Sequence, residues 1–276
     1  MKIGPQTPRA SAICGSTDTA IWVRGRELTG ELMGKVGFTE YFWLLVTGAP
    51  PTPAQSRILD ATLVAIAEHG LVPSVQVSRM TLAAAPEALQ GAVAAGLLGC
   101  GSVILGSAEA AGGFLAEIVR RMGAGRKVSQ EVDQEVESAA KALVGEYRAE
   151  GRAIPGYGHP LHKRADPRAE RLLAIAQEAG TAGQHTDVAR TLERLLPELV
   201  GKPLKLNVSG AIAAVLLDAG YPLAALKGVP LLARTAGLIA HLVEEQLRPI
   251  GFAMSDAAAQ AIRYDGDAPP GSEPKP

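Results

Sequence analysis

Residues 154–172 read IPGYGHPLHKRADPRAERL and form the most informative segment of the chain. It opens with a proline and two glycines, at Pro155, Gly156 and Gly158. Proline fixes one backbone angle and glycine tolerates conformations that other residues avoid, so we expect a tight loop with exposed amide groups. His159 follows directly and would lie beside those amides. The loop and its histidine are therefore the first candidate binding site.

A helix is predicted to begin just after this loop. Asp166 suits the N-cap, Pro167 suits the first helical position, and Arg168 adds a positive charge. A helix N-terminus beside Arg168 and His159 would attract a carboxylate or a phosphate. From the residue types alone, a glycine loop that only caps a helix is an equally good interpretation.

The spacing of His159 and His162 could also suggest a metal site. Structural zinc sites need three or four ligands, and no third Cys, His or paired carboxylate lies near these two histidines in the sequence. We therefore do not expect a metal here.

The composition favours a helical protein with a substantial core. Of the 276 residues, 47% are hydrophobic, which excludes global disorder. Only 4% are aromatic, and Ala, Leu and Gly dominate, a mixture that favours closely packed helices over sheets. The length allows one domain, or a main domain with a smaller lobe.

Charge and cysteine content narrow the class of protein further. A formal net charge of −1 gives no electrostatic footprint for nucleic acid. Cys14 and Cys100 are too few for a disulfide framework, so a reducing cytoplasm is expected. The N-terminus lacks the apolar core of a signal peptide. Asp218, Lys227 and Arg234 interrupt the longest apolar stretches, so no membrane span is expected.

The spacing of apolar residues predicts a succession of helices. After an arm or loop over residues 1–19, we expect helices at 25–37, 38–48, 53–70, 86–122 (one or two, interrupted near 99–102), 128–150, 167–179, 186–200, 208–219 and 228–247. No pair of strands joined by a hairpin turn is predicted. The tail 265–276 lacks apolar residues and is expected to be mobile or to lie over a partner subunit.

Residues 155–168, PGYGHPLHKRADPR, strongly resemble the signature of the citrate synthase superfamily. The resemblance continues in residues 23–52, which look like the opening helices of its short members, and in AEHG at 67–70, which looks like its histidine segment. LLARTAGLIAHLVEEQLRP at 231–249 resembles the closing helix of the family. Together these segments cover most of the chain.

The resemblance implies a role for each candidate residue. His159 would exchange a proton with the hydroxyl or carbonyl oxygen of the substrate, as the signature histidine of the family does. Carboxylate binding is implied for His69, Arg168, Arg234 and Arg248, and CoA binding for Pro155, Gly156, Tyr157 and Gly158. Guanidinium groups suit this task because they bind carboxylates through two hydrogen bonds. The family's counterpart of Arg248 reaches into the neighbouring subunit's site, so a homodimer is implied.

Two positions depart from the family pattern. The family places a histidine that stabilises the acetyl-CoA enolate in a GPLHGGANE-like segment, and the corresponding GSVILGSAE has Ile104 there. The family also places an acid–base aspartate in an NVD segment, where LNVSG has Ser209. An isoleucine cannot donate a hydrogen bond, and a neutral serine is a poor base near pH 7. Ordinary citrate synthase activity is therefore not expected.

The resemblance implies an all-α, two-lobed fold, with residues 1–107 and 207–276 forming a large domain and 108–206 a small inserted one. The short length resembles citryl-CoA lyases and the citrate synthase-like module of ATP-citrate lyase. The implied reaction is cleavage of citryl-CoA, or a related hydroxyacyl-CoA, into acetyl-CoA and oxaloacetate, with coenzyme A as part of the substrate and no metal. His159 would be the catalytic acid–base, and Ser209 is a candidate for proton transfer to carbon.

Two other interpretations remain open. The fold could carry a different acyl-CoA chemistry, such as thioester hydrolysis, with Glu109, Ser102 and Ser107 in new roles. Alternatively, the protein could bind CoA esters or tricarboxylates without turnover.

Overall fold

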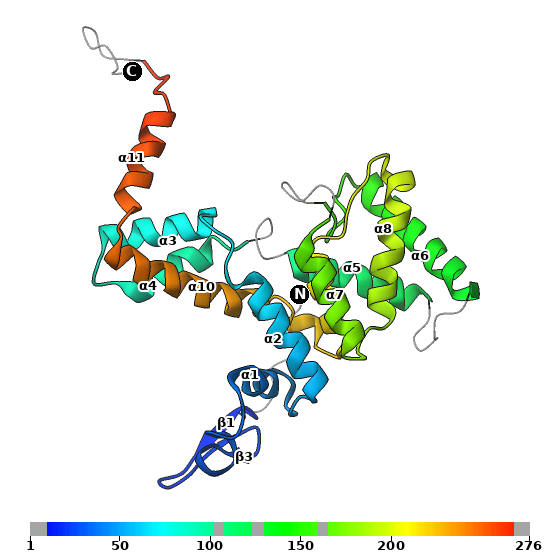
Figure 1. Ribbon diagram of the computed structural model, residues 1–276, viewed down its shortest axis with the longest axis horizontal. Coiled ribbons are helices and arrows are strands. Elements are labelled where there is room, and N and C mark those ends of the chain that lie inside the picture. Colours follow the sequence, from blue (N-terminus) through cyan, green and yellow to red (C-terminus); the bar gives the residue numbers. More distant parts are fainter. Residues whose placement is uncertain (1–9, 102–106, 123–129, 159–164, 268–276) are drawn as a thin grey trace. The chain divides into compact units, whose positions relative to one another are not determined.

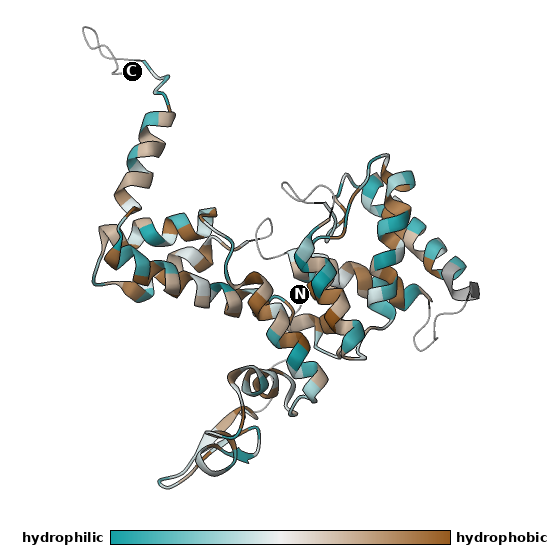
Figure 2. Cartoon of the chain, in the orientation of Figure 1, coloured by the Kyte–Doolittle hydropathy of each residue, from teal (hydrophilic) through white to brown (hydrophobic). Residues whose placement is uncertain are grey.

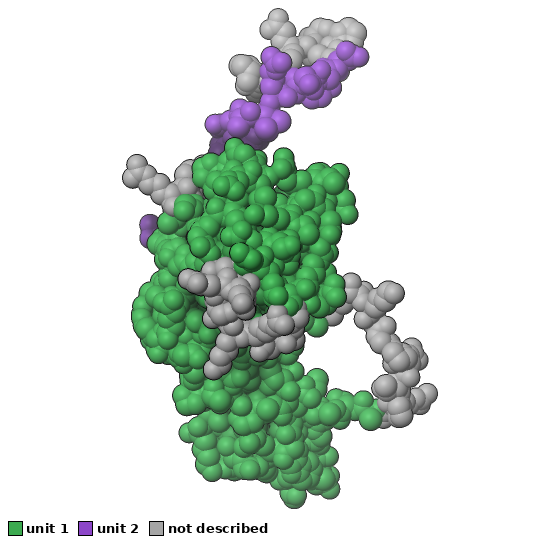
Figure 3. Space-filling model, turned by 90° about the vertical axis from the view of Figure 1, so that its right-hand side faces the viewer, with its two compact units in different colours: residues 1–66, 105–230 green, residues 67–104, 231–276 purple. Residues whose placement is uncertain are grey.

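The computed structural model describes residues 10–101, 107–122, 130–158 and 165–267, the side chains of 130–133 excepted. Helices make up most of these residues, together with one small sheet (Figure 1). The predicted all-α class is confirmed. The chain divides into unit 1, residues 1–66 with 105–230, and unit 2, residues 67–104 with 231–276 (Figure 3). The division into lobes at residues 108 and 206 stays a prediction.

Unit 1 contains the sheet and most of the helices. Its elements are β1 (Cys14–Ser16), β2 (Ile21–Val23), β3 (Arg26–Glu27), the π-helical turn η1 (Leu28–Leu32), α1 (Phe38–Thr47), α2 (Pro53–Ala67), α5 (Ser107–Met122), α6 (Gln130–Ala149), α7 (Pro167–Glu178), α8 (Gln184–Val200), α9 (Val208–Asp218) and the 3-10 turn η2 (Leu223–Ala225). Unit 2 contains α3 (Pro73–Ala84), α4 (Leu89–Leu98), most of α10 (Gly228–Leu247) and α11 (Gly251–Ala261).

Helix α9 forms the centre of unit 1. Its sequence VSGAIAAVLLD is apolar on nearly every side, and the residues from Ala211 to Leu216 are all buried. A helix of this kind is stable only when neighbours cover it all round. Helices α5, α7 and α8 provide that cover. The position of α9 thus fixes where the N-termini of its neighbours lie.

Helices α6 and α8 are amphipathic, and hydrophilic and hydrophobic residues alternate along both (Figure 2). Val188, Leu192 and Leu196 of α8 are fully buried, as expected for side chains at helical spacing on one face. On α6, Val136 and Leu143 are buried in the same way. The helices predicted at 128–150 and 186–200 are therefore confirmed.

The expectation that no hairpin exists was wrong. β2 and β3 form an antiparallel pair with Val23 opposite Arg26, and β1 adds a third strand. Arg24 (φ 51°) and Gly25 (φ 77°) both adopt the left-handed conformation, as a type I′ hairpin turn requires. The strands are too short to give a visible alternation of apolar residues. The helix predicted at 25–37 was wrong in extent. That range begins with strand β3 and contains only the short turn η1.

Unit 2 is built from a helical hairpin, α3 with α4, and from α10 and α11. Leu82, Ala92 and Leu242 form its apolar core. Gly96 of α4 lies so close to α10 that an added Cβ would be 2.7 Å from a methyl group of Leu238. Since glycine allows this approach, the small residues of α4 serve close helix packing, as the composition predicted.

One helical stretch among the described residues, Leu223–Leu247, is long and apolar enough to cross a bilayer. This differs from the expectation that charged residues interrupt every such stretch. Leu238 and Leu242 are fully buried inside the protein, and Arg234 is buried as well. Only 39% of the apolar window is buried, so length and composition alone do not decide between a membrane span and a helix that packs within a protein.

Candidate functional site

The N-termini of α5, α7 and α9 come together in unit 1. Ser107, at the start of α5, donates a hydrogen bond from its Oγ to Ser209 Oγ of α9 at 2.7 Å. The Asp166 carboxylate accepts from Arg168 N of α7 at 3.1 Å and from Val208 N of α9 at 3.0 Å. Helix N-termini carry partial positive charge and unpaired N–H groups. Their convergence therefore favours an anion at this place.

Asp166 holds this cluster together. It is almost fully buried, and Arg168 donates to its two oxygens from Nε and Nη2, each at 3.0 Å. Burial alone would raise the pKa of Asp166, but the bonds from Arg168 and Val208 N lower it below its usual range. The carboxylate therefore stays charged. The predicted N-cap at Asp166 and the proline at Pro167 are confirmed.

The glycine loop is pinned against the start of α9. Asn207 donates from its backbone N to Gly156 O at 3.0 Å and from Nδ2 to Gly158 O at 2.8 Å. Gly156 has φ 86°, and a Cβ there would lie 2.9 Å from the Cα of Gly210. Only glycine fits this combination of left-handed backbone and close contact. The tight loop predicted from the sequence is confirmed, and it lies directly beside the helix that carries Ser209. The expected exposure of its amide groups is not, because Gly156 and Tyr157 are buried and the Gly158 N–H donates to Lys205 O.

Two residues of the loop, Tyr157 and Gly158, donate hydrogen bonds to backbone carbonyl groups of unit 1. The phenol of Tyr157 is buried and donates to Ala189 O at 2.8 Å, and burial raises its pKa well above the usual value. The Gly158 N–H is also engaged, with Lys205 O at 2.7 Å. Tyr157 therefore anchors the loop through its side chain.

His159 and Ile104 lie outside the described residues. Of the other predicted site residues, Arg168, Ser209 and the loop Pro155–Gly158 belong to unit 1, where Asp166 and Asn207 join them in one hydrogen-bonded cluster. His69, Arg234 and most of the closing helix belong to unit 2.

The unit 2 residues differ in exposure. The Arg234 side chain is only 2% exposed, and its Nε and Nη1 have no hydrogen-bond partner among the described residues. A buried guanidinium with spare donors is suited to a carboxylate. Arg248 is the opposite case, because 81% of its side chain is exposed, with Glu244 at 3.5 Å. His69 lies in the exposed loop between α2 and α3.

Cys100 lies close enough to Arg234 for the two to interact, and its thiol is buried. Burial raises the pKa of this thiol, and the positive charge of Arg234 opposes the rise only in part. Cys100 is therefore a neutral packing residue near pH 7.

Sequence reasoning missed three residues that build the site: Asn207, Ser107 in its contact with Ser209, and Asp166 in its second role at α9. An Asn or Asp before a helical segment is a recognisable cap signal, and Asn207 could have been found in this way. The contacts Ser107–Ser209 and Asp166–Val208 join residues 102 and 42 positions apart. No local pattern indicates such pairs.

No group of three or more His, Cys, Asp or Glu residues suited to a metal occurs in the part of the chain that the structure describes. Two surface hollows lie beside α1, one of about 240 Å³ lined by apolar residues that include Leu28, Met33 and Phe38, and one that extends along the start of α2. Neither is lined by a predicted site residue.

Residues 9–250 match the family described as citrate synthase, C-terminal domain. The chain belongs to the citrate synthase family, and the resemblance read from its sequence is confirmed. Its structure is similar to citryl-CoA lyase from Hydrogenobacter thermophilus, with a TM-score of 0.81 and 30% identity over 97% of this chain and 98% of that one.

Two further comparisons place the chain among longer proteins. ATP citrate lyase from Methanothrix soehngenii, solved with citrate and coenzyme A, has the same fold over 96% of this chain and 43% of its own, with a TM-score of 0.75 and 21% identity. The putative citrate synthase 2 of Mycobacterium bovis is 28% identical over 201 residues, which are 71% of this chain and 49% of that protein. The chain thus spans about half the length of the curated relatives named citrate synthase.

Proposed function

We propose that this chain is a carbon–carbon lyase that cleaves citryl-CoA, or a close hydroxyacyl-CoA relative, into acetyl-CoA and oxaloacetate. The observation that carries the proposal is the end-to-end similarity to citryl-CoA lyase, 97% of one chain against 98% of the other. The curated citrate synthases match over only half their length. The convergence of helix N-termini around Ser209 supports it, because the reaction develops negative charge on the thioester.

The reaction requires the transfer of the hydroxyl proton, the cleavage of one carbon–carbon bond and the protonation of the enolate carbon. In our proposal His159 removes the proton of the tertiary hydroxyl, the carbonyl of oxaloacetate forms, and the adjacent carbon–carbon bond breaks. The electron pair moves onto the thioester as an enolate, which helix N-termini and backbone N–H groups stabilise. The enolate carbon then takes up a proton from water or from Ser209. The products contain all the atoms of the substrate, and no oxidant or water is consumed.

The Ser107–Ser209 pair has a defined place in this scheme. Its hydroxyl groups are 2.7 Å apart, so Ser107 can resupply a proton that Ser209 delivers to carbon. Neither hydroxyl is a strong base, and abstraction of a proton from acetyl-CoA would be slow. By microscopic reversibility, the group that protonates the enolate carbon in cleavage removes that proton in condensation, so the pair affects the rates of both directions and the equilibrium sets which one runs.

The carboxylates of the substrate would be bound by His69, Arg168, Arg234 and Arg248, and the CoA chain by the loop Pro155–Gly158. Arg234 supports this assignment best, since its buried guanidinium has spare donors. Asp166 accepts from Nε and Nη2 of the Arg168 guanidinium and so fixes the direction of that side chain.

We also propose a homodimer in the cytoplasm, in which Arg248 serves the partner's site. Ile239, Val243 and Leu247 are spaced by four residues on α10 and are 46%, 50% and 78% exposed, which forms an apolar stripe suited to a second copy. Mixing the variants Arg168→Ala and Arg248→Ala, each of which should bind the substrate poorly, tests this directly. Mixed dimers should regain activity because one of their two sites is intact. Activity that never returns after subunit exchange would contradict a shared site.

The reaction itself is tested by a mass balance of CoA thioesters after incubation with citryl-CoA. A lyase gives equimolar acetyl-CoA and oxaloacetate, whereas a thioesterase gives free CoA and citrate, and a binding protein returns citryl-CoA unchanged.

Arg168→Ala should weaken citrate binding by about 2–5 kcal/mol if the contact is buried. Arg168→Lys should recover part of this loss, because it keeps the charge without the fork of donors.

A further inference from the structure

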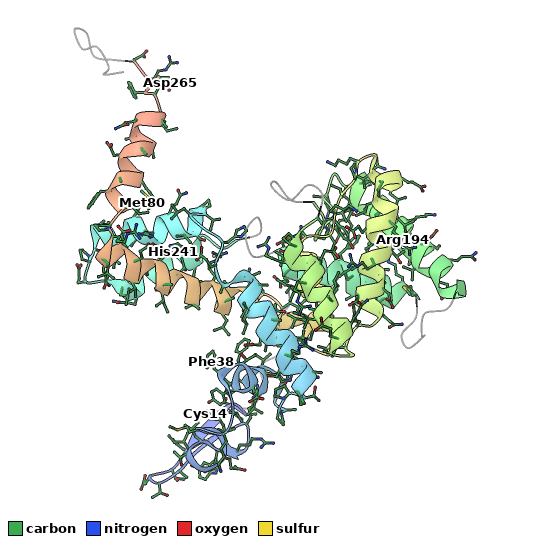
Figure 4. All side chains as sticks on the ribbon, in the orientation of Figure 1. Cys14, Phe38, Met80, Arg194, His241 and Asp265 are labelled. Carbon is green, nitrogen blue, oxygen red and sulfur yellow. The ribbon has the colours of Figure 1, made fainter. Side chains whose placement is uncertain are left out.

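A continuous series of polar contacts in unit 2 joins the loop that carries His69 to the segment that carries Arg248. Glu68 accepts from Gly70 N through one oxygen, and its other oxygen lies 2.8 Å from Nε2 of His241. His241, labelled on α10 in Figure 4, has its Nδ1 3.4 Å from Nη1 of Arg79. Residues 68 and 70 flank His69, so the series begins directly at a proposed substrate-binding residue.

Arg79 is the centre of this series. Its side chain is 2% exposed, and each nitrogen of the guanidinium is engaged. Nε donates to Glu245 at 2.6 Å, Nη1 donates to Glu244 at 2.8 Å, and Nη2 donates to the carbonyl oxygen of Arg248 at 3.1 Å. The backbone of the proposed cross-subunit arginine is therefore bonded directly to a buried side chain of α3.

Glu245 extends the series to the start of α11. It is 3% exposed and accepts from Ile250 N and Gly251 N at 3.0 and 2.7 Å. Burial alone would raise its pKa, but Arg79 and these N–H groups hold the pKa below its usual range. Arg248 lies between Glu245 and the two N–H groups in the sequence, so both ends of its short segment are fixed by one buried carboxylate.

The tautomer of His241 follows from its neighbours. A guanidinium can only donate, so Nδ1 of His241 must be the acceptor toward Arg79. The proton of the neutral ring then lies on Nε2, which is buried 2.8 Å from a Glu68 oxygen but does not meet it with hydrogen-bond geometry. The ring thus accepts at Nδ1 and carries its proton at Nε2, and a substitution can remove either group without the other.

We propose that Arg79 and His241 are positioning residues that hold His69 and Arg248 in the geometry needed to bind a carboxylate substrate. The proposal rests on the proposed function for the roles of His69 and Arg248. Neither positioning residue touches the substrate. Because the side chain of Arg248 is 81% exposed, its direction depends on its backbone, and that backbone is bonded to Arg79.

The two edges of His241 allow a matched pair of variants. His241→Asn keeps an acceptor near the place of Nδ1 and loses the donor toward Glu68. His241→Gln keeps a donor near the place of Nε2 and loses the acceptor for Arg79. We expect each variant to raise the KM for citryl-CoA about 3- to 10-fold while kcat changes less than twofold. Glu87→Gln, an exposed change between α3 and α4, is the control and should leave both constants unchanged.

Double variants separate positioning from a general structural effect. In an Arg248→Ala background, His241→Gln should have no further effect on KM, and in a His69→Ala background the same should hold for His241→Asn. Equal effects in the wild-type and the substituted backgrounds would overturn the proposal. So would an unchanged KM in both single variants.

Hydrogen exchange measured by mass spectrometry provides a readout that does not depend on turnover. His241→Asn should accelerate exchange in residues 67–71, and His241→Gln or Arg79→Lys in residues 248–252. If the wild type neither binds citrate nor cleaves citryl-CoA, the proposed function fails while this readout still decides the positioning. Exchange that stays at the wild-type rate in both segments would show that the contacts do not hold them.

Discussion

In unit 1 the buried carboxylates Asp166 and Asp218 are bonded to backbone N–H groups at helix N-termini and to side chains there, including the part-exposed Arg168. In unit 2 the buried carboxylate Glu245 is instead paired with a guanidinium that is itself buried. Asp166 bonds to the starts of α7 and α9, and Asp218 bonds to Gly183 N, His185 N and Thr186 N at the start of α8. Glu245 bonds to Arg79 as well as to the start of α11.

The difference shows how the candidate residues of each unit are held within that unit. Backbone donors at a helix end are fixed once the helix forms, so the unit 1 cluster depends on few side chains. The unit 2 contacts depend on side chains from α3 and α10 that must all be present together. Removing one member of a buried pair leaves an uncompensated charge. In unit 2 a substitution at a residue that does not touch the substrate should therefore disturb several side-chain contacts at once.

The largest effect is expected for Asp166→Ala. The change removes the N-cap of α7 and the acceptor for Val208 N of α9, and it leaves Arg168 without its bidentate partner, so the free energy of unfolding should fall by about 3–5 kcal/mol. Urea unfolding followed by circular dichroism measures this. Glu87→Ala, an exposed change between α3 and α4, is the control and should stay within about 0.5 kcal/mol of the wild type. A similar loss in both variants would remove the special role of Asp166.

Glu245→Ala should cost somewhat less, about 2–4 kcal/mol, because Glu244 and the carbonyl of Arg248 still accept from Arg79. The matched control is Glu244→Ala, which loses a 46% exposed partner of the same guanidinium and should cost about 1 kcal/mol or less. The same urea experiment ranks the two. If Glu244 were the costlier loss, the buried pair would not be what fixes the α10–α11 junction.

Asp218→Asn should lower the free energy of unfolding by about 2–3 kcal/mol near neutral pH. Burial alone would raise the pKa of Asp218, but bonds from His185 and Thr186 hold it below the usual range. A lowered native pKa means that the stabilisation is present above the unfolded pKa of about 4 and is lost as the pH falls through the native value. The difference between wild type and variant should therefore shrink below pH 4. A difference that grew on acidification would contradict this sign.

Ser107→Ala should have the smallest effect on stability, about 1 kcal/mol, since one partly buried hydroxyl bond is lost. If Ser107 resupplies a proton to Ser209, the same variant should also slow the release of acetyl-CoA from citryl-CoA, which stopped-flow assays with mass detection can follow. Ser16→Ala, exposed in β1, is the control for both measurements. Unchanged turnover would limit Ser107 to holding α5 beside α9.

Some helices gave no readable pattern, and the reason is visible in their packing. Helix α3 buries Ser74, Ser78 and Arg79 on its inner face, so its buried positions are largely polar and hide the period. Helix α11 has only Gly251 buried, so there is no apolar face to detect. The hairpin of β2 and β3 depends on Arg24 in a left-handed conformation that its sequence does not demand.

The sequence by itself determined the helical class, the family and the tight loop that leads to the helix at Pro167. These depend on local physics, because a left-handed glycine, an N-cap and a first-turn proline act within a few residues of one another. Only the tertiary structure decided which distant groups meet. Ser107 and Ser209 are 102 positions apart, and Arg79 and Glu245 are 166 apart. Such pairs form where helices pack side by side, and helix packing depends on the shapes of whole faces, which no single stretch of sequence contains.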